Sequence, residues 1–179
     1  QTYRAVMKKL DAYSPLGYSS AGEIIEVADD VTEFKVGDMV ACAGLGYASH
    51  AEIITVPVNL CVKLEENADL SQACYNTLGA ISLQGVRQSD LRLCESCAVI
   101  GLGLIGQLAC LQLKASGVRV VGIDVSESAV KTAASHCADL ALVRNTPGIN
   151  DKIDEYTNGL GVDAVIIAAA TPSLDPVNF

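Results

Sequence analysis

Three glycines at fixed spacing are the residues of this chain whose pattern points most directly to chemistry. Residues 97–106 read Cys-Ala-Val-Ile-Gly-Leu-Gly-Leu-Ile-Gly, an apolar strand that runs into G-x-G-x-x-G. We expect Gly101 to allow a tight turn and Gly103 to admit a pyrophosphate close to the backbone. Gly106 would let the following helix pack closely on the strand. The pattern predicts dinucleotide binding, and the alternative is a structural strand–helix unit without a ligand.

The acid that ends the next apolar strand bears on which dinucleotide binds. Asp124 would accept hydrogen bonds from the adenosine ribose hydroxyls and would repel a 2′-phosphate. The residues that follow, Val-Ser-Glu at 125–127, supply no Arg or Lys to bind such a phosphate. We therefore predict that the site prefers NAD(H) to NADP(H).

Two further segments should contribute to the same site. The helix whose first residues are Leu104 and Ile105 would direct unpaired N–H groups and the positive end of its dipole at the phosphates. Ala168, Ala169 and Thr171 lie at the end of the fourth apolar strand, where the cofactor crevice of a doubly wound sheet opens.

Other reactive residues have simpler interpretations. Cys94 and Cys97 form a C-x-x-C without a second pair, and because the motif enters a strand we interpret it as structural. His136 ends a predicted helix, where a positive charge suits the dipole, so we interpret it as structural too. His50 lies in a loop, either as a solvated side chain or as a proton-transfer group.

Composition excludes several classes of protein. The net charge of −9 over 179 residues opposes general affinity for nucleic acid or anionic membrane. No apolar stretch is long enough to span a bilayer, and the N-terminus is too polar for a signal peptide. Seven cysteines, an odd number, with several inside apolar runs, favour a reduced, cytoplasmic protein.

The elements that position these residues alternate between strand and helix. Residues 13–57 read as β-structure, including strands at 17–27 and 51–56, and residues 70–88 read as helical. Strands are then expected near 97–101, 118–123, 139–143 and 162–169, with helices near 104–116, 126–136 and 148–158. The four parallel strands would take the order 3-2-1-4. The open edge at the fourth strand favours a homodimer through strand pairing, or a missing segment in a chain that looks like a fragment.

Further motifs make the whole chain resemble the medium-chain dehydrogenase/reductase family, the relatives of zinc-type alcohol dehydrogenases. They are Gly-Tyr-Ser-Ser-Ala-Gly-Glu-Ile-Ile-Glu-Val at 17–27, Phe-Lys-Val-Gly-Asp-Met-Val at 34–40, Tyr-Ala-Ser-His-Ala-Glu at 47–52, Val-Pro at 56–57 and Thr-Leu-Gly-Ala at 77–80. The resemblance implies an α/β fold with a partial GroES-like β-lobe and a partial Rossmann doubly wound parallel sheet. We expect the GroES-like catalytic lobe over residues 1–60, a helical connection over 61–88 and the NAD-binding domain over 89–179.

Departures from the family pattern bear on the reaction. Tyr18 stands where zinc-dependent members have a histidine ligand, and Ala80 stands where a cysteine ligand would fall. The family's four-cysteine structural-zinc lobe is also missing, so we predict no zinc. By the same resemblance Tyr18 is a candidate catalytic residue, with Thr77 and Gln84 near the nicotinamide.

The resemblance implies a zinc-independent, NAD(H)-dependent oxidoreductase. It would transfer hydride to or from a carbonyl, alcohol or enone of a small-molecule substrate. The alternative is a non-enzymatic dinucleotide-binding module, or a scaffold within a larger fused oxidoreductase.

Overall fold

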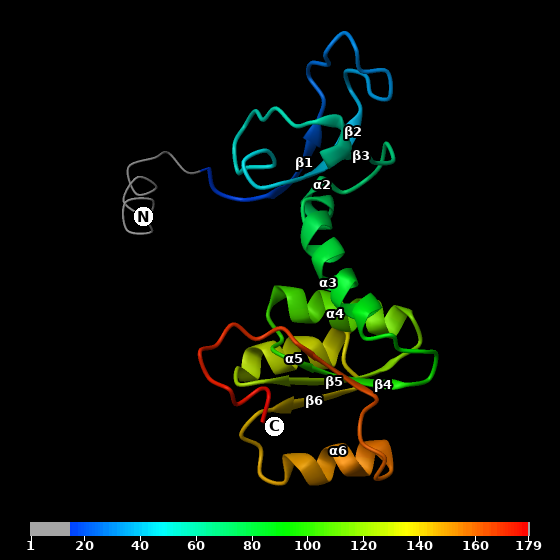
Figure 1. The fold of residues 1–179 in the computed structure, drawn as a ribbon, viewed down its shortest axis with the longest axis vertical. Coiled ribbons are helices and arrows are strands. Elements are labelled where there is room, and N and C mark those ends of the chain that lie inside the picture. Colours follow the sequence, from blue (N-terminus) through cyan, green and yellow to red (C-terminus); the bar gives the residue numbers. More distant parts are fainter. Residues whose placement is uncertain (1–14, 179) are drawn as a thin grey trace, which may run out of the picture. The chain divides into compact units, whose positions relative to one another are not determined.

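The computed structural model describes residues 15–178, and the chain divides into two compact units, residues 1–78 and 79–179 (Figure 1). The division falls within one long helix, α3 (Asn76–Gln88). The residues of each unit form their own sheet.

The first unit contains a three-stranded antiparallel sheet in the order β1-β2-β3. Its strands are β1 (Ser19–Glu23), β2 (Met39–Ala43) and β3 (Cys61–Lys63). Its short helices are the 3₁₀ turn η1 (Val58–Leu60) and α2 (Leu70–Ala73). Val40, Cys42 and Ala48 form a small buried core. The Lys63 ammonium pairs at 2.7 Å with the buried carboxylate of Asp38, which ties β3 to the turn before β2.

Several sequence predictions for this unit were wrong in detail. The predicted strand over 51–56 is not a strand, although Ile54 and Val56 pack against the small core. The predicted strand over 17–27 pairs only from 19 to 23, and β3 was not predicted at all. The helical region predicted over 70–88 is present, as two helices interrupted at residues 74–75.

The second unit is a parallel sheet with helices on both faces, as predicted (Figure 1). Its strands are β4 (Ser96–Ile100), β5 (Arg119–Asp124), β6 (Leu140–Val143) and β7 (Ala164–Ile167). Its connecting helices are α4 (Leu104–Ala115), α5 (Glu127–His136) and α6 (Ile149–Thr157). The order β6-β5-β4-β7 confirms the predicted 3-2-1-4 arrangement.

Alternate residues of the central strands supply two cores in this unit. Cys97, Val99 and Val120 face α4 and α5, whereas Ala98 and Val121 belong to the core on the α6 side. Every residue of β4 is buried, and apart from Ser96 the strand is apolar, as expected for a parallel strand covered on both faces. The carboxyl ends of all four strands therefore meet at one edge of a well-packed sheet, which positions the loops described next.

Candidate functional site

The loop between β4 and α4 turns at Gly101. This residue has φ +97°, and its N–H donates to the Ile123 carbonyl at 2.8 Å. A Cβ placed on Gly101 would lie 2.6 Å from the backbone nitrogen of Ala169. Both the positive φ and this close approach require glycine, so the first glycine of the motif makes the predicted tight turn.

The other two glycines of the motif occupy contrasting surroundings. Gly106 is buried, and a Cβ there would collide with the carbonyl oxygen of Gly101. It thus packs α4 against the loop itself, where the sequence predicted close packing on the strand. Gly103 is exposed, and a Cβ on it would have no heavy atom within 4 Å. Space is therefore left beside the backbone at Gly103.

The N-terminus of α4 opens at this space. Gly103 is the N-cap residue and provides no side-chain hydrogen bond to the first turn. Leu104 is 49% exposed, and Ile105 is half-buried. Unpaired N–H groups at the start of a helix, with the positive end of its dipole, form a ready site for an anion such as a pyrophosphate.

Asp124, at the end of β5, is held against this loop. One of its carboxylate oxygens accepts the Leu102 N–H at 2.6 Å, and the other accepts the Ser126 N–H at 2.7 Å. Each oxygen keeps a further lone pair that a ribose hydroxyl can use. The carboxylate therefore joins the loop after β4 to the loop after β5, a role that the spacing of the sequence motif did not reveal.

The segment that follows β7 completes this edge of the sheet. The Ala168 N–H donates to the Ile100 carbonyl at 2.8 Å, and Ala169 lies against Gly101. Thr171 is exposed, and its hydroxyl accepts the Ser173 N–H at 3.1 Å. The structure thus brings Ala169 to the glycine loop, whereas Thr171 makes a local turn within its own segment.

A basic residue that the sequence reasoning missed lies beside Asp124. Arg144 directly follows β6, and its backbone N–H donates to the Asp124 carbonyl at 2.8 Å. Its guanidinium binds the Asp175 carboxylate through two nitrogens, at 2.8 and 2.9 Å. The predicted strand order, with β6 next to β5, was the signal that could have found it.

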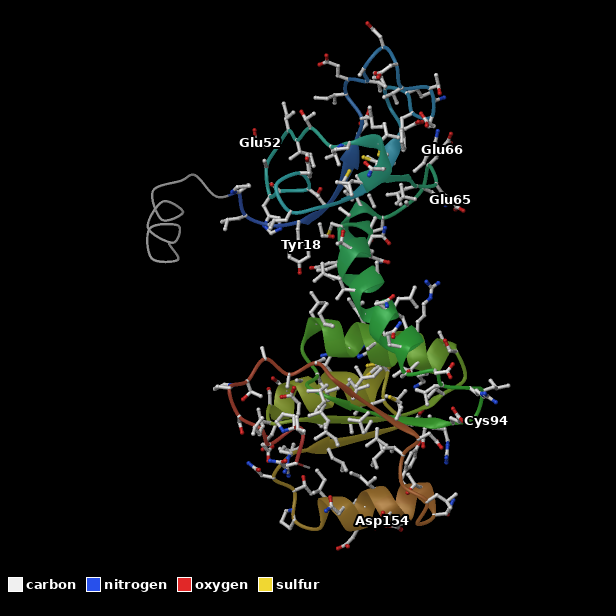
Figure 2. The ribbon with its side chains drawn as sticks, in the orientation of Figure 1. Tyr18, Glu52, Glu65, Glu66, Cys94 and Asp154 are labelled. Carbon is white, nitrogen blue, oxygen red and sulfur yellow. The ribbon has the colours of Figure 1, made fainter. Side chains whose placement is uncertain are left out.

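In the first unit, the two candidate proton-transfer residues, Tyr18 and His50, lie at or against the segment that precedes β1. Tyr18, labelled in Figure 2, directly precedes β1, is 39% exposed and accepts the Gly44 N–H on its carbonyl oxygen at 3.0 Å. The His50 ring lies against Gly17, where a Cβ would be 2.5 Å from the imidazole Nε2. Because Gly17 has φ +88°, glycine is required there both for conformation and for contact with His50.

The remaining polar candidates serve as structural links or stand apart. Thr77 donates its hydroxyl to the Cys42 carbonyl and its N–H to the Ser19 hydroxyl, each at 3.3 Å, and so joins α3 to the small sheet. Gln84 is exposed on α3. The His136 ring contacts the Thr132 carbonyl at 2.9 Å, at the end of α5.

The two cysteines of the C-x-x-C motif lie in different surroundings. Cys94 is exposed before β4 (Figure 2), whereas Cys97 is fully buried in the core. Burial raises the pKa of the Cys97 thiol to about 11. Between residues 15 and 178, no three His, Cys, Asp or Glu side chains form a group that could hold a metal ion.

Two family models match the chain. The alcohol dehydrogenase GroES-like domain matches residues 2–66, and the zinc-binding dehydrogenase model matches residues 105–176. The chain belongs to the medium-chain dehydrogenase/reductase family. A curated relative, D-guloside 3-dehydrogenase from Shigella flexneri, is 34% identical over 154 residues, which are 84% of this chain and 43% of the relative.

Solved structures of this family share the fold. The 2R,3R-butanediol dehydrogenase from Bacillus subtilis is 27% identical with a TM-score of 0.76, over 88% of this chain and 52% of that one. A quinone oxidoreductase from Pseudomonas syringae is 28% identical with a TM-score of 0.73, over 85% and 48% of the two chains. The chain thus spans about half the length of the relatives it matches.

Proposed function

We propose that this chain carries the adenosine and pyrophosphate half of an NAD(H) site in a zinc-independent oxidoreductase. The observation that carries the proposal is the uncapped N-terminus of α4 at Gly103, with the Asp124 carboxylate fixed beside the same loop. A relative named NAD-dependent alcohol dehydrogenase, from Sulfurisphaera tokodaii, is 29% identical over 180 residues and supports the choice of cofactor.

Each part of the loop has a defined task in this proposal. The N–H groups of Leu104 and Ile105 bind the pyrophosphate, and the bare backbone at Gly103 lets it approach. Asp124 accepts the adenosine ribose hydroxyls on the lone pairs that its backbone partners leave unused. Ala169 and Thr171, after β7, border the path toward the nicotinamide. When bound, the nicotinamide supplies or receives the hydride.

Tyr18 is the proposed catalytic acid in the GroES-like unit. The phenol can donate a proton to a carbonyl oxygen, or accept one from an alcohol, while hydride is transferred. Its exposure and its place in the family motif support this role. The phenol also replaces the histidine that zinc-dependent members use as a metal ligand at this position.

The proposed partners follow from the same features. The substrate is a small carbonyl, alcohol or enone compound. Among the described strands, β7 pairs only with β4, and Val165 and Ile167 on it are 52% and 46% exposed, which supports a homodimer through this edge. Seven free cysteines support a reducing compartment such as the cytoplasm. In the described part of the chain, no helix has the length and apolar character needed to cross a membrane.

Calorimetric titration of the chain with separate pieces of the cofactor tests the proposal. NADH and ADP-ribose should both bind, because the described site recognises the adenosine and pyrophosphate groups. Nicotinamide mononucleotide should not bind measurably, and NADPH should bind at least about 10-fold more weakly than NADH because of repulsion from Asp124. Equal binding of NADH and NADPH would overturn the selectivity, and no binding of NADH or ADP-ribose would overturn the site.

The Tyr18→Phe variant tests the catalytic proposal in the full-length protein, with a carbonyl compound that the wild type reduces. We expect kcat to fall by about 100-fold with little change in NADH affinity, because only the proton donor is lost. Tyr47→Phe is a matched control, since Tyr47 is also exposed in the same unit. An unchanged kcat would remove Tyr18 from the chemistry, and NADH binding without turnover of any substrate would favour the binding-module alternative.

A further inference from the structure

Two cysteines of the GroES-like unit face each other across neighbouring strands. Cys42 on β2 and Cys61 on β3 are direct partners in the antiparallel register. Their sulfur atoms are 3.8 Å apart. Formation of a disulfide would require the sulfurs to approach by roughly 1.8 Å, since an S–S bond is about 2.0 Å long.

The backbone at this pair already suits a disulfide. The Leu64 N–H donates to the Met39 carbonyl at 2.8 Å, so Met39 and Leu64 form a hydrogen-bonded pair next to the pair Val40 and Lys63. Hydrogen-bonded and non-hydrogen-bonded positions alternate along an antiparallel ladder, which makes Cys42 and Cys61 a non-hydrogen-bonded pair. Such pairs have Cα atoms about 4.5 Å apart, within the range of about 4.4–6.8 Å found for disulfides.

The two thiols differ in their access to solvent. Cys42 is 6% exposed, and burial, with a smaller contribution from Cys61, raises the pKa of its thiol to about 12. Cys61 is half-buried, and its thiol contacts the Pro57 carbonyl at 3.5 Å. An oxidant from solution therefore reaches Cys61 first, while Cys42 stays buried as a protonated thiol.

We propose that Cys42 and Cys61 form a peroxide-sensitive dithiol site that closes to a cross-strand disulfide. The Cys61 thiolate attacks hydrogen peroxide, the O–O bond breaks, and Cys61 becomes a sulfenic acid while one water leaves after protonation. The Cys42 sulfur then attacks the Cys61 sulfur, the S–O bond breaks, and the Cys42 proton leaves with the hydroxyl as a second water. Two thiols and one peroxide give one disulfide and two waters.

The disulfide would close the segment that connects the two strands into a covalent loop. This segment, residues 43–60, contains His50, whose N–H donates to the Leu16 carbonyl, and Gly44, whose N–H donates to the Tyr18 carbonyl. The disulfide would therefore restrain the loop that bonds to Leu16 and Tyr18. The proposal goes beyond the proposed function and does not depend on cofactor binding or turnover.

Peptide mapping of the intact chain after hydrogen peroxide treatment and thiol alkylation tests the proposal. Trypsin releases residues 36–63 as one peptide, since no Lys or Arg lies inside it, and this peptide contains only these two cysteines. We expect the peptide to lose two hydrogens and to take up no alkylating agent, and dithiothreitol should reverse both changes. A second cleavage after Glu52 should leave its two halves joined.

A second cysteine pair in the same chain provides the internal control. The thiols of Cys110 and Cys137 also contact each other, but both residues are at most 1% exposed. Their oxidation should be at least about 10-fold slower, because peroxide must reach a thiolate. Cys61→Ser should keep Cys42 reduced, whereas Cys110→Ser should leave the 36–63 linkage unchanged.

Two results would overturn the proposal, and both can be read from the wild-type chain without any variant. One is accumulation of Cys61 sulfinic acid without a link between the halves of the 36–63 peptide. The other is a disulfide that joins Cys61 to a cysteine of a different tryptic peptide.

Discussion

Replacement of Gly106 by alanine is expected to lower the free energy of unfolding by about 3 kcal/mol and to abolish detectable NADH binding. The new methyl group would collide with the carbonyl oxygen of Gly101, which is backbone and cannot rotate away. Either α4 moves away from the sheet or the loop changes its turn, and in both cases the phosphate-binding N–H groups are displaced. Urea unfolding and calorimetric titration with NADH measure the two effects.

Two other glycines separate the contributions of packing and ligand contact. Gly85→Ala, inside α3, should raise stability by up to about 1 kcal/mol and leave NADH binding unchanged, because a Cβ there meets nothing within 4 Å. Gly103→Ala should also leave stability nearly unchanged, yet it should weaken NADH binding by at least about 100-fold because the methyl group occupies the pyrophosphate position. Wild-type NADH affinity in Gly103→Ala would contradict the assignment of this loop.

Replacement of Asp124 by arginine is expected to reverse the cofactor preference, from NADH to NADPH. NADH affinity should fall by about 100-fold, because the ribose hydroxyls lose a charged acceptor and the loop loses its bonds from Leu102 and Ser126. NADPH affinity should rise above that for NADH, because a guanidinium can bind the 2′-phosphate. Parallel titrations with both cofactors measure the exchange.

Controls for this substitution separate charge from geometry. Asp154→Arg makes the same change in net charge, from −9 to −7, at an exposed position on α6 (Figure 2), and should alter neither affinity by more than about 2-fold. Asp124→Asn keeps one carbonyl oxygen and should lose NADH affinity by about 10-fold. If Asp154→Arg had the larger effect, long-range charge and not ribose recognition would set the preference.

The Rossmann-like unit could be predicted nearly element by element. Its strands are continuous apolar runs because both faces of the sheet are covered, and Gly117 and Gly159 stop helices where the backbone needs positive φ. Ser126 caps α5 by accepting the Ala129 N–H, as a serine directly before a helix commonly does. Local sequence carried this information because the strands are continuous apolar runs and the helix ends carry glycine and serine signals.

The GroES-like unit was predicted less well because its sheet depends on pairing. The alternating side chains around Ile54 and Val56 are half-buried, but the backbone there has no described strand as a partner. Alternation reports which side chains are covered, and it does not report whether a neighbouring strand exists. Strand β3 was missed for the opposite reason, since only three residues pair and Val62 and Lys63 are exposed.

In the candidate site, residue types could be predicted but their mutual contacts could not. The motif spacing placed Gly101 and Asp124 on neighbouring loops, and the structure adds the bond from Leu102 to Asp124. Arg144 stayed hidden because its proximity to Asp124 follows from strand order and not from sequence distance. The approach of His50 to Gly17 likewise required the loop to return to β1.

The two backbone bonds of Asp124 also determine when the loop becomes ordered. Fixing a residue of free backbone costs about 1–2 kcal/mol, so a ligand that had to order residues 101–103 would forfeit much of its contact energy. Here the carboxylate already holds Leu102 and Ser126 without any ligand. That entropy is lost when the chain folds, and a dinucleotide meets a preorganised surface that it can engage in one step, without a conformational search.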